Sequence, residues 1–121
     1  MFVVTSNKSI QLLLLNFIGH VRLEELARKR EEIKMLLADL SPGFRVLGDF
    51  SHLEAMDADC LPEIGRNMEL FDQSGVGLVV RVMPDTSKDL GLNILTLFHY
   101  RQHPLVVTCE TLLEAAKALS L

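Results

Sequence analysis

The chain has 121 residues, enough for one domain with its own hydrophobic core, and 49% of them are hydrophobic while 23% are charged. This composition is typical of a globular protein and argues against a disordered one. The formal net charge of −4 argues against a nucleic-acid-binding protein, which needs a clustered basic surface to neutralise phosphates.

The longest apolar run and the cysteines indicate the compartment. Residues 10–18 are too few for a membrane span, which needs about 20 apolar residues, and no small-residue cleavage site follows them. Cys60 and Cys109 lie far apart without CxxC spacing, so we expect neither a disulfide framework nor a zinc site. These features predict a soluble protein of the reducing cytoplasm, without a membrane span.

The start of the chain predicts a β-hairpin. Residues 2–5 have the pattern of a strand and residues 6–8 that of a turn. Residues 10–17 predict a second strand, apolar at nearly every position as expected when both faces of a sheet are covered. Gly19 and His20 are expected to end this strand.

The middle of the chain predicts two amphipathic helices around a strand. Apolar residues recur at helical spacing over residues 23–40, and Ser41-Pro42-Gly43 ends this helix. Residues 44–50 predict the third strand, and the next helix is expected to open at Asp57. Its apolar stripe consists of Leu61, Ile64, Met68 and Phe71.

The rest of the chain continues the alternation, with strands over residues 76–83 and 105–108 and helices over residues 88–100 and 110–119. The element order is therefore β-β-α-β-α-β-α-β-α. Right-handed crossovers between such strands imply an α/β fold, a single domain over residues 1–121. We expect a mixed, mostly parallel five-stranded sheet packed with four helices, its first strand antiparallel at or near an edge.

One stretch within this order resembles a known family. Residues 46–57 read Val-Leu-Gly-Asp-Phe-Ser-His-Leu-Glu-Ala-Met-Asp, which is an apolar strand, an Asp-x-Ser, a short loop and an aspartate at a helix start. With the element order, this stretch resembles the STAS family of sulfate-transporter and anti-sigma-factor-antagonist domains, in particular its divergent SpoIIAA-like branch. The resemblance covers nearly the whole chain and implies a STAS-like domain, related in architecture to the lipid-binding CRAL-TRIO domains.

The resemblance also implies a position for a regulatory switch. In antagonist members of the family, a partner kinase phosphorylates the serine after the second aspartate and so switches binding to an anti-sigma factor. Asp49 and Asp57 match the pattern, but Ala58 occupies the position of that serine, Asp59 that of the next serine and Cys60 that of a glycine. Alanine has no hydroxyl group, so we expect a loop that keeps the family's shape without its phosphoacceptor.

Two interpretations of the aspartates in this loop stay open. Asp57 and Asp59 can cap the helix, because a helix N-terminus offers free N–H groups and a partial positive charge. Alternatively, a fixed carboxylate at Asp59 can imitate the phosphorylated state. Thr86 and Ser87 follow the next strand, so we expect them beside this loop, either at the edge where ligands collect in open α/β sheets or as ordinary helix caps.

No residue pattern predicts catalysis, a cofactor or a metal. Cys60 would lie in a first helical turn, where the dipole favours a thiolate, but Asp57 and Asp59 oppose ionisation and an inert, partly buried thiol is expected. His99 and His103 are four residues apart, but a following proline places His103 beyond the helix end. Without a triad or a paired acid and base, we do not expect an enzyme.

The sequence therefore predicts a non-catalytic binding or regulatory module that acts through protein contacts at the Asp57 loop. The alternative is a carrier or sensor of a small apolar ligand, by analogy with the CRAL-TRIO relatives. In the predicted helix over residues 88–100, Leu92 and Leu95 point away from the stripe that would cover the sheet, with Tyr100 beside them. Such exposed apolar residues predict a homodimer contact or an apolar pocket.

Overall fold

The computed structural model describes residues 1–83, 100–102 and 104–121. The predicted helix over residues 88–100 lies outside them except for its last residue, Tyr100, which is not helical. The other predicted site residues that fall outside the described part are Leu92, Leu95, Thr86 and Ser87.

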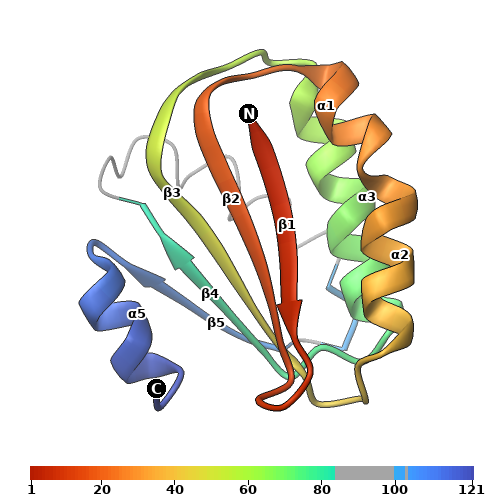
Figure 1. The fold of residues 1–121 in the computed structure, drawn as a ribbon, viewed down its shortest axis with the longest axis vertical. Coiled ribbons are helices and arrows are strands. Elements are labelled where there is room, and N and C mark those ends of the chain that lie inside the picture. Colours follow the sequence, from red (N-terminus) through yellow and green to blue (C-terminus); the bar gives the residue numbers. More distant parts are fainter. Residues whose placement is uncertain (84–99, 103) are drawn as a thin grey trace.

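The described part is built on one five-stranded sheet, in the order β1-β2-β3-β4-β5 (Figure 1). Strand β1 pairs antiparallel with β2, and the other neighbouring pairs are parallel. This arrangement confirms the predicted mixed, mostly parallel sheet with an antiparallel first strand at its edge. The strands are β1 Phe2–Asn7, β2 Leu12–Val21, β3 Arg45–Met56, β4 Leu78–Val82 and β5 Leu105–Cys109.

Strands β2 and β3 run further than their apolar patterns predicted. Gly19 does not end β2, because a left-handed φ of 66° lets the chain continue to Val21. Strand β3 continues past Phe50 to Met56, beyond the end of its pairing with β4. The register of β2 and β3 shifts twice over this extension, as expected where an extra residue bulges out of a strand. Residues 51–56, which were expected to form a loop, therefore belong to β3 and pair with β2 through bulges.

The helices also differ in their bounds from the prediction. The single helix expected over residues 23–40 is two, α1 Leu23–Arg28 and α2 Arg30–Ala38, separated at Lys29. The break is local, because the Lys29 N–H still bonds the Glu25 carbonyl at 3.2 Å and the Lys29 carbonyl still accepts the Ile33 N–H at 3.0 Å. Helix α3 spans Cys60–Gln73, so it opens three residues later than predicted.

The last described helix, α5, spans Leu112–Ala118. Its N-cap is Thr111, whose side-chain oxygen accepts the Glu114 N–H at 3.2 Å. None of the helices in the described ranges is long and apolar enough to cross a membrane.

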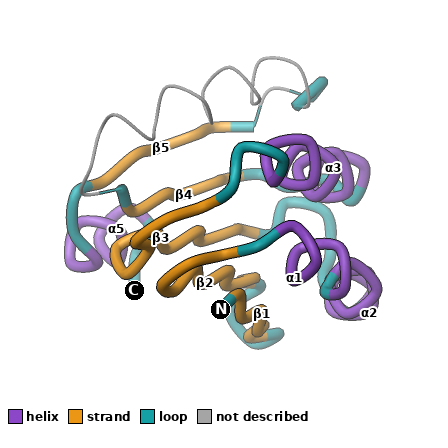
Figure 2. The backbone as a smooth tube through the Cα atoms, turned by 90° about the horizontal axis from the view of Figure 1, so that it is seen from above, coloured by secondary structure: helices purple, strands orange, loops and turns teal. Residues whose placement is uncertain are grey.

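The sheet lies between two unequal layers of helix (Figure 2). Helices α1, α2 and α3 cover one face of the sheet and α5 lies on the other. Alternate side chains of each strand point to opposite faces, so the sheet contributes apolar residues to a separate core on each side. The core under the three helices includes Phe2, Leu13, Leu15, Phe17, Leu26, Ile33, Val46, Phe50, Ile64, Met68, Phe71 and Val79. The core under α5 consists of Leu12, Leu47, Val80, Val82, Cys109, Ala115 and Leu119.

Candidate protein-binding edge of the sheet

The candidate site lies where β2 and β3 end and the chain turns into α1 and α3, at the top of Figure 1. Residues 57–59 form a turn between β3 and α3, and all three are exposed. The backbone holds this turn to the helix, because the Asp57 carbonyl accepts the Cys60 N–H at 3.0 Å and the Ala58 carbonyl accepts the Leu61 N–H at 3.3 Å. The carboxyl ends of parallel strands are the usual position of binding loops in open α/β sheets.

Neither aspartate of this turn caps α3 with its side chain. Asp59 occupies the N-cap position but makes no side-chain hydrogen bond to the helix. Asp57 lies outside the helix, and its Oδ1 is 2.8 Å from Nε2 of His20. The predicted capping role is therefore wrong for the carboxylates, because no side chain caps the N-terminus of α3. A polar side chain on β2 holds the Asp57 carboxylate.

Ala58 lies at the exposed tip of the turn, between the two aspartates. Its side chain is a methyl group, so the turn presents a small apolar surface flanked by two carboxylates.

Cys60 is an inert thiol in this setting. It is completely buried, and its Sγ lies 3.7 Å from the Val21 carbonyl oxygen. Burial raises the pKa of the Cys60 thiol, and the negative charges of Asp59 and Asp57 raise it further. A thiolate nucleophile at this position is therefore disfavoured.

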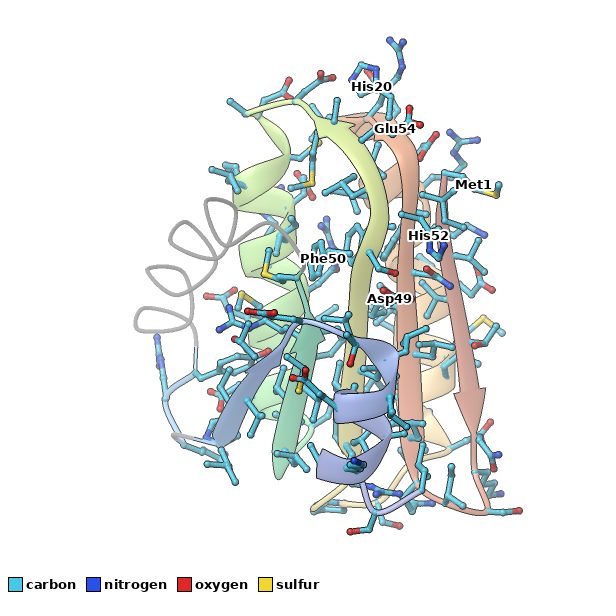
Figure 3. The ribbon with its side chains drawn as sticks, turned by 90° about the vertical axis from the view of Figure 1, so that its left-hand side faces the viewer. Met1, His20, Asp49, Phe50, His52 and Glu54 are labelled. Carbon is cyan, nitrogen blue, oxygen red and sulfur yellow. The ribbon has the colours of Figure 1, made fainter. Side chains whose placement is uncertain are left out.

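Asp49 is not part of the exposed turn. It is only 4% exposed, and its Oδ1 accepts hydrogen bonds from the Ser51 backbone N–H at 2.9 Å and from the Ser51 hydroxyl at 2.6 Å. Nδ1 of His52 lies 3.2 Å from the Ser51 Oγ. Figure 3 shows Asp49 and His52 along β3, with His20 and Glu54 at the end of the sheet.

This arrangement of Asp49, Ser51 and His52 does not have the order of a catalytic triad. In a triad the histidine lies between the serine and the carboxylate and takes the proton of the serine. Here the serine lies in the middle and donates to the carboxylate. The contacts instead satisfy a buried carboxylate beside the bulge of β3. Within the described residues, no three histidine, cysteine or acidic side chains converge as metal ligands.

Tyr100 lies inside the protein and not on an exposed surface. It is 3% exposed and belongs to the core under α1, α2 and α3. With Phe17, Phe50 and Met68 it lines a cavity of about 40 Å³ between the sheet and α3, where Arg81 also contributes. Ligand pockets for drug-sized molecules are roughly ten times larger, so this cavity is too small for a lipid.

Acidic side chains dominate the end of the sheet around the turn. The charges of Glu24, Asp57 and Asp59 all act on the buried Cys60 thiol, which places them around it. Glu54, in the bulge of β3, lies at the same end of the molecule (Figure 3). We call these four exposed residues, Glu24, Glu54, Asp57 and Asp59, the acidic edge.

Sequence reasoning missed two features of this site. It treated His20 as the end of a strand, whereas the structure pairs His20 with Asp57. It also treated Ser51 and His52 as loop residues, whereas they belong to β3 and contact each other. Gly19 could have indicated the irregularity. A glycine inside an apolar run and before a polar residue is typical of a bulge as well as of a strand end.

No family model and no curated protein matches the sequence, but several solved structures match the fold. An uncharacterized protein from Shewanella loihica with a SpoIIAA-like fold is 12% identical, with a TM-score of 0.73 over 98% of this chain and 92% of the other. The phosphorylated form of the Bacillus cell fate determinant SpoIIAA is 14% identical, with a TM-score of 0.63 over 98% of this chain and 99% of the other. An anti-sigma factor antagonist from Mycobacterium paratuberculosis is 18% identical, with a TM-score of 0.62 over 100% of this chain and 94% of the other.

These matches cover almost the whole of each chain, as the resemblance of residues 46–57 led us to expect. The chain therefore has the SpoIIAA-like fold, in a single STAS-like arrangement of strands and helices.

Proposed function

We propose that this chain is a non-catalytic regulatory module that binds a protein partner through the acidic edge and the turn at residues 57–59. The fold supports this proposal, because solved proteins that share it include anti-sigma factor antagonists. Because a fold alone does not assign a function, the proposal also rests on the geometry and charge of the site.

The observation that carries the proposal is the exposed turn at the end of the sheet. Asp57, Ala58 and Asp59 are all exposed, and the turn is tied to α3 by backbone hydrogen bonds and to β2 by His20. A surface that is both exposed and held in one shape binds a partner with little loss of conformational entropy. The nearby reactive side chains are withdrawn from the surface, because Cys60 is buried and the buried Asp49 carboxylate is bonded to Ser51.

Charge indicates the kind of partner. The acidic edge brings together four carboxylates, so it complements a basic surface. A second copy of this chain meeting it through a two-fold axis would place the same carboxylates against each other. We therefore propose a different, basic protein as the partner at this edge, and a homodimer through Leu92 and Leu95 stays a separate prediction.

The same site leads to a proposal about regulation. Because Ala58 has no hydroxyl group, the module is not switched by phosphorylation at the position that the STAS family uses. A carrier of apolar ligands is the weaker proposal, because the 40 Å³ cavity beside Tyr100 admits only a few water-sized molecules.

Site-directed crosslinking tests the proposed binding edge. Both native cysteines are buried and free, so a new surface cysteine can be labelled with a photo-crosslinker selectively. Ala58→Cys places the probe on the turn, and Ala38→Cys is a matched control because Ala38 is also exposed, at the end of α2. We expect a specific product from cell extract with the probe at position 58 and not at position 38.

The charge of the edge provides the second half of the test. Asp59→Lys should abolish the crosslink from position 58, whereas Asp39→Lys, an exposed aspartate at the end of α2, should leave it unchanged. The yield of the crosslinked product should also fall with rising salt concentration, since salt screens the attraction between exposed charges. Equal products from positions 58 and 38, or a product from position 58 that tolerates Asp59→Lys, would rule out this edge.

A further inference from the structure

His20 is brought to Asp57 by an irregularity in the sheet. Between Gly19 and His20 the register of β2 against β3 shifts from Leu53 to Ala55, so Glu54 is the extra residue of a bulge. Gly19 has a φ of 66°, a left-handed conformation that glycine adopts without strain. The bulge thus sets the direction of His20, whose Nε2 lies 2.8 Å from the Asp57 Oδ1.

The contact joins two segments that are 37 residues apart in the chain. Asp57 is held by its side chain to β2 and by its carbonyl to the first turn of α3. Because Asp59 makes no side-chain bond to α3, the His20 contact is the side-chain restraint on this end of the turn in the described part of the chain. Both side chains are accessible to solvent, at 42% for His20 and 47% for Asp57.

We propose that His20 and Asp57 form a proton-sensitive latch that sets the order of the turn at residues 57–59 and so regulates the binding edge. Histidine gains and loses its charge between about pH 5 and 8. A protonated imidazole adds a positive charge to its hydrogen bond with the carboxylate, so the contact is stronger than the one that a neutral imidazole makes. Acidification therefore tightens the turn, and mild alkali loosens it.

Other charged groups belong to the segments that lead into and out of this contact or pair with those segments, and the variants proposed here leave them unchanged. They are Arg22 after β2, Glu24 and Glu25 of α1, Glu54 of β3, Asp59 of the turn and the Met1 ammonium group, which is 3.4 Å from the Glu25 Oε2.

Two amide variants separate the latch from a general effect of the histidine. In His20→Gln the side-chain nitrogen lies close to the position of Nε2, the atom that contacts Asp57, whereas in His20→Asn it lies close to Nδ1. Neither amide changes its charge with pH. The latch therefore predicts that glutamine keeps part of the restraint without its pH dependence, and that asparagine loses both.

Amide hydrogen exchange at residues 57–61, corrected for intrinsic rates, measures the order of the turn at about pH 5.5 and 8. For the wild type we expect about two- to fivefold more protection at the lower pH, in line with an exposed ion pair. His20→Gln should show intermediate protection that does not change with pH, and His20→Asn should show the least. His52→Gln, at another exposed histidine, is the control and should behave as the wild type.

Equal protection of the wild type at both pH values, or full protection in His20→Asn, would overturn the latch. The regulatory part of the inference depends on the proposed binding edge, but the two can fail separately. Exchange is measured on the isolated protein, whereas the crosslink from position 58 needs the partner. A crosslink that forms equally at both pH values, with a normal exchange result, would keep the latch and remove its regulatory role.

Discussion

Tyr100 is the single tyrosine of a chain without tryptophan, and its surroundings decide how it titrates. The side chain is buried in the core under α1, α2 and α3. Burial raises the pKa of Tyr100 because it disfavours the phenolate, with the positive charge of Arg81 opposing this and the negative charge of Asp72 adding to it. The backbone N–H groups of Arg101 and Gln102 bond the buried Asp72 carboxylate at 2.9 and 3.2 Å, which fixes the chain just after this tyrosine.

We predict that Tyr100 does not ionise at the ordinary value for tyrosine while the protein is folded. In the unfolded chain it should ionise near pH 10, about the model value. Because the unfolded state releases its protons first, stability should fall as the pH rises above about 9, where Cys60 and Cys109 contribute, and further above about 10, where Tyr100 contributes. The ultraviolet absorbance of the phenolate reports this residue alone, and identical titrations in buffer and in urea would contradict the prediction.

At the scale of elements, Glu63 connects two helices of the same layer. It lies in the first turn of α3 and is buried, and its two carboxylate oxygens accept hydrogen bonds from Arg30 of α2 and from Arg66 of α3. The Arg30 Nε also lies 3.4 Å from Oδ1 of Asn67. A carboxylate this far from water requires both its charge partners and its hydrogen bonds.

Glu63→Ala should therefore be markedly destabilising, because it leaves the half-buried Arg30 guanidinium without its carboxylate. We expect a loss of about 1–3 kcal/mol in the free energy of unfolding, below the range for a fully buried pair because water reaches part of Arg30. Arg66→Ala is the matched control, since that arginine is mostly exposed and should cost about 0–1 kcal/mol. Urea unfolding measures both, and equal losses would show that the burial of Arg30 is irrelevant.

At the scale of the whole molecule, the sheet separates two cores of different size. Three helices pack on one face of the described part, whereas α5 is a seven-residue helix on the other. Ala115 of α5 and the C-cap residue Leu119 contact the sheet, and Arg45 of β3 donates a hydrogen bond to the Leu119 carbonyl. The smaller core should therefore depend strongly on its few apolar side chains.

Leu119→Ala tests this dependence. Leu119 is 1% exposed, so the substitution should lower the free energy of unfolding by about 2–5 kcal/mol, as for other buried leucines. Leu113→Ala changes a leucine within α5 that is 67% exposed and should shift stability by less than about 0.5 kcal/mol. Thermal and urea unfolding of both variants provide the comparison, and a small effect of Leu119→Ala would mean that α5 does not contribute to a cooperative core.

Much of this architecture follows from sequence patterns alone. The apolar run at residues 10–17 and the helical stripe of Ile64, Met68 and Phe71 predicted their elements, because the side-chain periods of strand and helix differ. The predicted mixed sheet and its antiparallel first strand are confirmed by the structure. The lack of a hydroxyl at position 58 is likewise a property of the sequence, whatever the fold around it.

The geometry of the site depended on tertiary structure. The continuation of β2 and β3 requires that each strand finds backbone partners on the other, and a local pattern containing Gly19 does not contain that information. The contact between His20 and Asp57 depends on a register shift between segments 37 residues apart. Sequence thus determined the order of the elements through local periodicity, whereas long-range pairing of the backbone decided which polar side chains meet at the edge of the sheet.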